Sequence, residues 1–361
     1  MRYLLGSNRT LIVRGPASVR LLDGRGRILG APLEHERIII RKEKQLPIEA
    51  ITEIELEILR SELGTILEIE GSSIPASWNA AAETLAEMNG GRAVIVGAGD
   101  VGKSTLCTYL TNKLLERGLK LRVVDADVGQ ADIGPPTTVG SAVPSNRFIS
   151  SLADLKPEAL IFIGDTSPSR VENKLIKAIR RLADNQHEKP AITIINTDGW
   201  TLDSYAILYK IKMISSIQPD LVLELSTGNE LQPILSGSRA RSLKVEAANE
   251  VLIRSRRDRR VIRTSGYRRF LNGASVRTLP LSEVEVLMPN GRTPLRAPFN
   301  PKLKNVIVGL LDENGYLNQI GILLGLEKTF VKLYSRPADV RRIELGYLKL
   351  SKGGSELGYV E

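Results

Sequence analysis

The sequence contains little cysteine and little histidine. Its 361 residues include a single cysteine, Cys107, and two histidines. One cysteine excludes an internal disulfide framework and a cysteine-based zinc site. Two histidines make a histidine-rich metal centre or a histidine-based catalytic triad a poor interpretation. Cys107 itself is expected to be a small packed side chain rather than a nucleophile.

Long apolar segments are also missing. No apolar run approaches the ~20 residues that a membrane-spanning helix needs, and residues 1–6 lack the apolar stretch of a signal peptide. The apolar fraction of 42% and the charged fraction of 25% are those of an ordinary globular protein. We therefore expect a soluble, cytoplasmic protein that does not bind membranes. Its length predicts two or three domains.

Positive charge is concentrated in one segment. The formal net charge is +9, and residues 254–269 contain eight arginines but only one acid, Asp258. Few glutamates stand four residues before these arginines, so the segment has little opportunity to neutralise itself as a helix. A solvated surface helix is the plain alternative. Otherwise the natural partner is a polyanion, either a nucleic acid or the phosphates of a nucleotide.

Three textures follow one another along the chain. Residues 1–75 read as short strands with frequent turn signals, which is typical of a small sandwich or barrel. Residues 76–265 alternate buried strands with helices, which predicts a doubly wound parallel sheet. The first of these helices is expected to begin at Ser77 as N-cap. Residues 266–361 return to β structure, with a hairpin turn at 312–315.

A phosphate-binding loop opens the central region. Residues 97–104 read Gly-Ala-Gly-Asp-Val-Gly-Lys-Ser and match G-x-x-x-x-G-K-[ST] at every specified position. A buried strand precedes the loop and a helix follows it, as the motif requires. In such loops the lysine reaches the β- and γ-phosphates and the serine ligates Mg²⁺. The expected nucleotide-binding residues are Gly97, Gly99, Asp100, Val101, Gly102, Lys103, Ser104 and Thr105.

Acidic residues follow the next two strands. Asp127 lies at the carboxyl end of the strand after the loop, where open parallel sheets carry their ligand groups. A carboxylate there can accept the proton of a hydroxyl that attacks a phosphate. The alternative is a polar turn in which Asp125 caps the strand end. Asp165 ends a further strand, and the sequence leaves open which acid stands beside the metal ion.

Trp200 follows another buried strand. An exposed indole at the edge of a sheet is a stacking platform for bases, whereas a core aromatic under a loop is the usual alternative. Its polar neighbours Asp198, Gly199 and Thr201 favour the exposed loop. Trp78, in contrast, is expected to pack beneath its helix.

The assembled motifs resemble those of the polynucleotide 5′-hydroxyl kinases, which include the RNA 5′-kinase subunit of pre-mRNA cleavage and tRNA-splicing complexes and archaeal relatives. The loop 97–104 matches the family's P-loop, and residues 125–130 match its acid-x-Asp-x-Gly-Gln segment. Residues 196–200 match an Asn-Thr-x-Gly-Trp signature whose tryptophan stacks on the acceptor base. Residues 21–30 are similar to a segment of the family's amino-terminal domain.

Two further segments carry the resemblance. Residues 164–168 are similar to the "clasp" that holds the acceptor phosphate, and Arg254 and Arg259 match a pair of lid arginines five apart. The clasp departs from the eukaryotic pattern, because no asparagine follows Ser167-Pro168 at the usual distance. Arg170 and Asn173 are the nearby candidates to replace it. Thr166 and Ser167 either donate to a phosphate or cap the helix that follows.

The resemblance implies an α/β fold in which a central P-loop NTPase domain is flanked by small β-rich domains. It divides the chain at 1–75, 76–265 with the arginine lid, and 266–361. It also implies transfer of the γ-phosphate of ATP or GTP, with Mg²⁺, to the 5′-hydroxyl of RNA or DNA. The implied catalytic residues are Lys103, Asp127, Arg254 and Arg259, the metal ligands Ser104 and Asp127, and the acceptor-binding residues Thr166, Ser167, Trp200 and Gln130.

Two rival functions remain in view. A GTPase would need a base-reading motif such as Asn-Lys-x-Asp, which residues 196–198 do not match. A catalytically inactive nucleotide-binding scaffold of an RNA-processing complex would be marked by loss of Asp127 or of the lid arginines, and all of these are present. The choice between ATP and GTP, the choice between RNA and DNA, the oligomeric state and any protein partners stay open.

Overall fold

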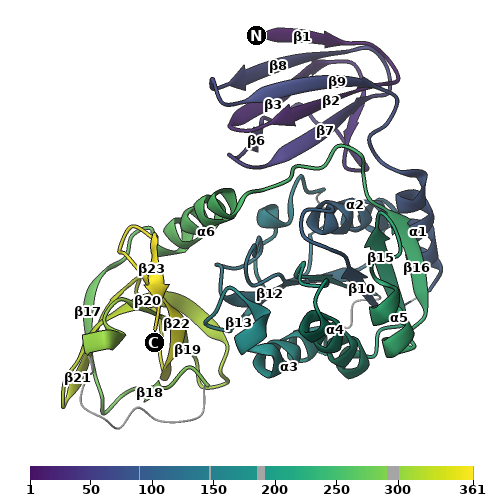
Figure 1. The fold of residues 1–361 in the computed structure, drawn as a ribbon. Coiled ribbons are helices and arrows are strands. Elements are labelled where there is room, and N and C mark those ends of the chain that lie inside the picture. Colours follow the sequence, from purple (N-terminus) through teal and green to yellow (C-terminus); the bar gives the residue numbers. More distant parts are fainter. Residues whose placement is uncertain (89, 146–147, 185–191, 291–300, 361) are drawn as a thin grey trace. The chain divides into compact units, whose positions relative to one another are not determined.

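A computed structural model describes residues 1–361 except 89, 146–147, 185–191, 291–300 and 361 (Figure 1). The chain forms two compact units, each built from separate segments. The first comprises Met1–Val123, Val143–Lys156 and Gln186–Asp258, and the second Val124–Ala142, Pro157–Asn185 and Arg259–Glu361. Their boundary passes through strand β11 (Leu121–Ala126). The division at residues 75 and 265 stays a prediction.

The amino-terminal part of the first unit is a β-sandwich. Its two sheets have the strand orders β1-β8-β3-β6 and β5-β4-β7-β2-β9, and apolar side chains from both share one buried core. The alternating burial along β3 is that of a strand with one face in the core. The predicted β texture is confirmed. The strands are β1 (Arg2–Leu5), β2 (Arg9–Arg14), β3 (Ala17–Asp23), β4 (Gly26–Ile28), β5 (Ala31–Pro32), β6 (Ile38–Ile40), β7 (Gln45–Ala50), β8 (Ile54–Arg60) and β9 (Thr65–Glu70).

A parallel sheet completes the first unit, in the order β11-β14-β10-β15-β16. Strand β10 is parallel to both β14 and β15, and β15 is parallel to β16. Figure 1 shows α1 and α2 on one side of these strands and α4 and α5 on the other, which confirms the doubly wound arrangement. The elements are α1 (Ala76–Glu87), β10 (Gly91–Val96), α2 (Lys103–Glu116), β14 (Ile192–Thr197), α4 (Ser204–Ile217), β15 (Leu221–Ser226), α5 (Gln232–Ser238) and β16 (Ser242–Glu246).

The start of α1 differs from the sequence prediction. The N-cap is Pro75 rather than Ser77. The Ser77 hydroxyl instead donates to the Glu246 carboxylate at 3.2 Å and accepts from the Glu246 backbone N–H at 3.1 Å. The Trp78 indole N–H donates to the Glu246 carbonyl at 2.8 Å, and its ring lies edge-on to Tyr109. Trp78 is fully buried, so its predicted packing role is confirmed, and Ser77 helps to join α1 to β16.

The second unit breaks the expected parallel order. Here β11 is followed in the sheet by β12 (Thr138–Ala142) and β13 (Ala159–Phe162), and β12 and β13 are antiparallel. The prediction of parallel strands is wrong for this pair. A parallel pair needs a long crossover, usually a helix, whereas an antiparallel pair does not. In the described part of the segment between them, the one helix is a three-residue turn at Leu152–Asp154.

The rest of the second unit is a β-rich carboxy-terminal region. Its sheet has the order β17-β21-β20-β19-β22-β18, and β23 pairs with β22. Phe162 of β13 and Tyr267 of α6 belong to the same core as Ile307 and Ile320 of this sheet, so these elements pack on it. The elements are α3 (Glu172–Ala183), α6 (Arg256–Leu271), β17 (Ser275–Pro280), β18 (Glu285–Leu287), β19 (Val306–Leu311), β20 (Leu317–Leu326), β21 (Phe330–Ser335), β22 (Arg342–Leu350) and β23 (Glu356–Tyr359).

Two local features of this region are the predicted hairpin turn and an ion pair between α3 and β22. The hairpin turn at 312–315 joins β19 to β20, and Gly315 has a φ of 81° as the turn requires. Lys174 of α3 donates to the Ile163 carbonyl at 2.9 Å and forms an ion pair with Glu344 of β22. This pair holds the end of strand β13 against the carboxy-terminal sheet.

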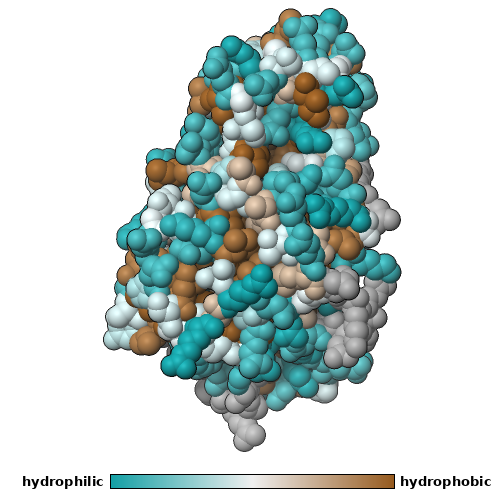
Figure 2. Space-filling model, turned by 90° about the vertical axis from the view of Figure 1, so that its right-hand side faces the viewer, coloured by the Kyte–Doolittle hydropathy of each residue, from teal (hydrophilic) through white to brown (hydrophobic). Residues whose placement is uncertain are grey.

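The surface alone does not mark a site. Figure 2 shows hydrophilic residues over much of one face, with smaller groups of hydrophobic residues between them. Single exposed apolar side chains are normal on folded domains. Among the described residues, none of the helices combines the length and the apolar character needed to cross a bilayer. The motifs at the strand ends, and not the character of the surface, mark the candidate site.

Candidate active site

The P-loop lies in the first unit, between β10 and α2. Gly102 is the N-cap of α2, with a φ of 97°, and no side chain caps this helix. The first backbone N–H groups of an α-helix have no partner within the helix. Together with the positive end of the helix dipole, they form an anion site. The local structure therefore fits a loop that receives phosphate oxygens.

Lys103 and Ser104 stand at the start of α2. The Lys103 ammonium is nearly buried and donates to the Ala98 carbonyl at 2.6 Å, which folds the side chain back over the loop. The Ser104 hydroxyl accepts from the Asn196 amide at 3.3 Å. Asn196 begins the Asn-Thr-x-Gly-Trp motif but is not among the site residues predicted from the sequence. The available signal was its place at the carboxyl end of β14, beside β10.

The loop after β14 packs directly on the P-loop. A Cβ atom added to Gly199 would lie 2.7 Å from the backbone N and Cα of Gly99. Real side chains do not approach that closely, so only glycine fits there. This contact places the Trp200 loop next to the phosphate-binding loop within the first unit.

Trp200 is partly exposed, and several contacts hold it. Its ring stacks on buried Tyr209 with centroids 5.7 Å apart, and its indole N–H donates to Asp203 at 2.6 Å. Hydrogen bonds to the Asp203 carboxylate keep its pKa below the usual range. The bond from the Ala206 backbone N–H has the larger effect, and the bond from this indole has the next largest. The indole therefore stands in a defined orientation at the edge of the sheet.

The neighbours of Trp200 are not exposed, contrary to the sequence expectation. Asp198 is 4% exposed and Thr201 is 1% exposed. Burial is possible because Asp198 forms an ion pair with fully buried Lys210 at 3.0 Å. The Asp198 carboxylate also accepts from the Trp200 backbone N–H and the Tyr209 hydroxyl, both at 3.0 Å. A buried charge network therefore supports the tryptophan.

The second unit carries the acidic loop. Asp125 is buried and accepts from the backbone N–H groups of Asp132 at 2.7 Å and Ile133 at 3.2 Å. Asp127 is partly exposed, and one of its oxygens accepts from the N–H groups of Gly129 at 3.2 Å and Gln130 at 3.0 Å. Asp125 thus organises the loop, as the turn-capping alternative expected, and Asp127 is oriented by it.

The clasp segment follows β13 in the same unit. Asp165 is fully buried, and burial raises the pKa of its carboxyl. One oxygen accepts from the Ser167 backbone N–H at 3.0 Å, and the other lies 3.4 Å from Nε of Arg170. Neither Thr166 nor Ser167 caps a helix through its side chain, so the capping alternative is wrong.

The arginines are better paired than the sequence suggested. Arg254 binds the Asp100 carboxylate through its backbone N–H at 2.9 Å and its guanidinium at 3.3 Å. Arg260 and Arg263 both form ion pairs with Glu356 of β23. The partners lie far away in sequence, so a search of local spacing could not find them. Arg259 lies on α6.

A metal ion would need more than these side chains. Among the described residues, no three or more His, Cys, Asp or Glu side chains gather closely enough to hold one. Mg²⁺ at kinase sites usually takes one or two protein oxygens and completes its shell with phosphates and water. The Ser104 hydroxyl is an oxygen donor of the kind such an ion accepts, so this residue fits an ion that arrives with the nucleotide.

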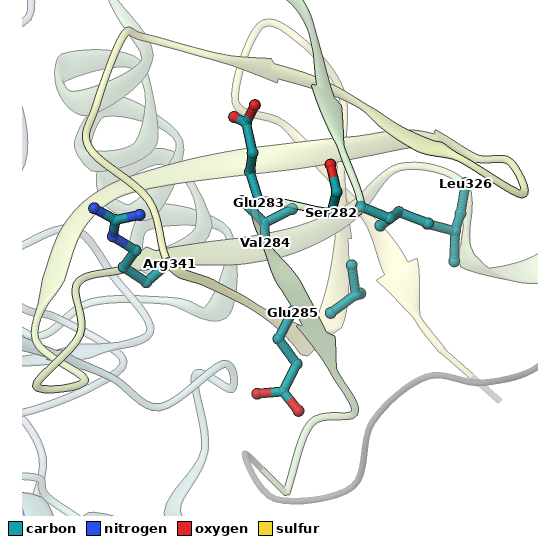
Figure 3. Close-up of a pocket in the computed structure, with 8 residues that line it drawn as sticks. Ser282, Glu283, Val284, Glu285, Leu326 and Arg341 are labelled. Carbon is teal, nitrogen blue, oxygen red and sulfur yellow. The ribbon is translucent and has the colours of Figure 1, made fainter.

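A cavity of about 580 Å³ lies in the carboxy-terminal region, away from every motif in sequence. Figure 3 shows that the side chains of Glu283, just before β18, and Glu285, its first residue, point in opposite directions. They therefore do not converge on one ligand. The lining residues are Leu281, Ser282, Glu283, Val284, Glu285, Val286, Leu326 and Arg341.

Comparison with known proteins agrees with these motifs. Residues 97–273 match the family model of the mRNA cleavage and polyadenylation factor CLP1 P-loop. A polyribonucleotide 5′-hydroxyl-kinase of Pyrococcus furiosus is 30% identical over 320 residues, covering 74% of this chain and 90% of the relative. The chain belongs to the polyribonucleotide 5′-hydroxyl-kinase family. A relative of the same name from Methanocaldococcus jannaschii is 26% identical over 74% of this chain and 89% of its own length.

A eukaryotic relative and a solved structure extend the comparison. Polyribonucleotide 5′-hydroxyl-kinase Clp1 of Xenopus tropicalis is 32% identical over 146 residues, which cover 38% of this chain and 33% of that protein. The wild-type Clp1p–Pcf11p (454–563) complex contains a chain with a TM-score of 0.73 and 12% identity, matched over 97% of both chains. The fold of this family member is therefore that of Clp1, with β-rich regions on both sides of a P-loop domain.

The Asp198–Lys210 pair generates a stability prediction. Lys210→Met would leave the Asp198 carboxylate buried without its cation, and breaking a buried pair in this way typically costs about 3–5 kcal/mol. We expect a loss of this size in urea unfolding, together with a shifted Trp200 emission. Lys212→Met, at an exposed position of the same helix, is the control and should change stability by less than about 0.5 kcal/mol. Equal unfolding midpoints for the two variants would contradict the network.

Proposed function

We propose that the chain transfers the γ-phosphate of ATP or GTP to the 5′-hydroxyl end of RNA. The observation that carries this proposal is the complete P-loop at the start of α2, in a chain whose relatives are named polyribonucleotide 5′-hydroxyl-kinases. An inactive scaffold remains the weaker interpretation, because the chain retains Lys103, Asp127 and both lid arginines. DNA ends are a second acceptor class that the same assay tests.

The first unit would bind the triphosphate. The amides of residues 97–102 and the amino terminus of α2 would surround the phosphates, and Lys103 would leave the Ala98 carbonyl to contact the β- and γ-phosphates. Mg²⁺ bound with the nucleotide would neutralise phosphate charge, with the Ser104 hydroxyl as a ligand. The Asn196 amide, which donates to that hydroxyl, would orient its lone pairs. Arg254 would add positive charge beside the loop, where Asp100 already holds it.

The second unit would supply the group that activates the acceptor. As the 5′-oxygen forms a bond to the γ-phosphorus, the bond from that phosphorus to the β–γ bridging oxygen breaks and a nucleoside diphosphate leaves. The hydroxyl proton passes to the Asp127 carboxylate. Amides of the following loop hold one Asp127 oxygen, which fixes the orientation of this carboxylate at the strand end. Arg259 would stabilise charge on the phosphoryl group in transfer.

The acceptor end would be held by residues outside the P-loop. Trp200 would stack on the terminal base, while Thr166, Ser167 and Gln130 would donate to the first phosphate of the strand. Stacking on an indole tolerates any base. This assignment therefore predicts an enzyme with little preference for the sequence of its substrate.

The direct test is transfer of labelled phosphate. A 5′-hydroxyl oligoribonucleotide incubated with the chain, Mg²⁺ and γ-labelled ATP should become labelled at its 5′ end, and a 5′-phosphorylated oligonucleotide should not. Parallel reactions with GTP and with a DNA acceptor give the preferences. Absence of label with every nucleotide and acceptor, while the chain still binds ATP, would overturn the proposal in favour of the scaffold.

Asp127 generates the sharpest kinetic prediction. Asp127→Asn keeps the shape of the side chain and its oxygen acceptor for the loop amides but cannot take a proton. We expect kcat to fall by about 10²–10⁴-fold, with the affinity for ATP and the melting temperature unchanged. Normal turnover, or loss of activity only through loss of Mg²⁺–ATP binding, would remove Asp127 as the base.

Asp125→Asn gives the contrasting variant. An asparagine there replaces one carboxylate oxygen by an NH₂ group, which faces either the backbone N–H of residue 127 or those of residues 132 and 133. We expect this variant to lower the melting temperature, because buried donors lose their acceptor. The two substitutions thus separate a chemical role from a structural one.

Trp200 generates a binding prediction. Trp200→Ala should raise KM for the oligonucleotide by about 5–150-fold, the range of 1–3 kcal/mol for one stacked base, and should change KM for ATP little. Trp200→Phe should recover part of the loss. A raised KM for ATP with an unchanged KM for the oligonucleotide would contradict the stacking role.

A further inference from the structure

The side chain of Arg170 lies between two tyrosine rings of the carboxy-terminal region. Its guanidinium carbon is 4.8 Å from the ring centroid of Tyr359 on β23 and 5.6 Å from that of Tyr347 on β22. Tyr359 is 42% exposed, and the side chain of Arg170 is 50% exposed. An aromatic ring and an arginine are therefore presented to solvent together, all within the second unit.

Tyr359 also touches the clasp itself. Its hydroxyl lies 3.0 Å from Oγ1 of Thr166, within hydrogen-bonding distance. Thr166 is one of the residues proposed to hold the acceptor strand. The end of β23 thus contacts the clasp through a hydrogen bond and the nearby Arg170 through a ring contact.

Close backbone contacts hold the clasp segment against strand β22. The Tyr347 N–H donates to the Gly164 carbonyl at 2.8 Å. A Cβ atom at Gly346 would lie 2.7 Å from that same carbonyl oxygen, and one at Gly164 would lie 2.9 Å from the Gly346 Cα. The two segments approach so closely that neither position has room for a side chain. The tyrosines on this part of the sheet therefore keep a set position relative to the clasp.

Asp165 forms an ion pair with the arginine. One oxygen of its fully buried carboxylate accepts from the Ser167 N–H, and the other lies 3.4 Å from Nε of Arg170 without a hydrogen bond. A guanidinium has five N–H donors in a planar fork, so engagement of Nε leaves its other edge suited to a second anion. Arginine binds phosphate oxygens through that geometry.

We propose that Tyr359 and Arg170 form a second contact surface for the acceptor strand, in which the Tyr359 ring stacks on an unpaired base and Arg170 binds a backbone phosphate. The ligand class is a single-stranded polyribonucleotide, for which stacking platforms combined with cations are the general mode of recognition. This inference rests on the proposed kinase function, because the clasp is taken to lie at the acceptor. It gives the carboxy-terminal region a role in substrate binding.

The same region contains a matched control. Arg181 lies 4.1 Å from the ring centroid of Tyr316, and its guanidinium donates to the Asn314 carbonyl at 2.7 Å. Like Arg170 and Tyr359, this pair places a guanidinium over a tyrosine ring. Arg181 belongs to helix α3, and its ring partner belongs to the carboxy-terminal region. Arg181, Tyr316 and Asn314 all lie outside the clasp, so a purely structural role accounts for the contacts of Arg181.

The test measures binding of a 5′-hydroxyl oligouridylate, labelled at its 3′ end, by fluorescence anisotropy without nucleotide. Tyr359→Leu keeps an apolar side chain but removes the π-face, and we expect affinity to fall at least about fivefold. Tyr359→Phe should bind within about twofold of the wild type, and Tyr316→Leu should not change affinity. Arg170→Gln should reduce the slope of log affinity against log salt by about 0.7–1, the value of one phosphate contact.

Several outcomes would overturn the inference. These are wild-type affinity of Tyr359→Leu, an equal loss for Tyr359→Phe, or a loss for Tyr316→Leu of the same size. A drop in melting temperature and in ATP affinity that accounts for the whole effect would show that Tyr359 is only structural. If the oligonucleotide binds in a ring-dependent way but the wild type transfers no phosphate, the kinase proposal fails while this binding surface stands.

Discussion

Three buried carboxylates organise the loops that carry the candidate chemistry. A carboxylate removed from water is costly unless hydrogen bonds or a cation compensate it. Each of the three stands at or just beyond the end of a strand and accepts from the backbone N–H two residues later, as aspartates do in tight turns. That hydrogen bond fixes the conformation of the residue that follows. The buried aspartates are Asp125, Asp165 and Asp198, and the N–H groups belong to Asp127, Ser167 and Trp200.

The cations that complete two of these sites come from the segment after the loop. Lys210 on α4 compensates Asp198, and Arg170 compensates Asp165. A short loop and the following helix thus form one electrostatic unit with the strand end. This explains how polar residues around Trp200 can be buried while the indole itself remains accessible.

Sequence patterns predicted what depends on neighbouring residues. Local spacing and hydrophobicity account for the P-loop, the alternation of strand and helix from β10 to β11 and from α3 to β15, the hairpin at 312–315 and the packing of Trp78. Strand β7 contains Pro47, and because proline normally argues against an internal strand, the local sequence does not indicate a strand there. The role of Ser77 was missed because its partner Glu246 lies 169 residues away. The exposed assignment of Asp198 failed because polarity was judged without its cation.

The candidate site likewise contains residues that local motifs predict and residues that only the fold brings together. Short motifs with a characteristic spacing of residues indicate part of the site from the sequence alone. They contain Gly97–Ser104, Asp127 and Trp200. Arg170 and Tyr359 lie far apart in sequence, and only the pairing of β22 with β23 beside the clasp brings them together. A stacking residue contributed by a distant strand has no signature, since a lone tyrosine in a β-rich segment reads as part of a sheet. The carboxy-terminal region therefore carries no recognisable chemistry in its sequence. The fold brings its strand β23 to the loop in which the buried Asp165 carboxylate forms an ion pair with Arg170, and this contact gives the region a route to substrate binding.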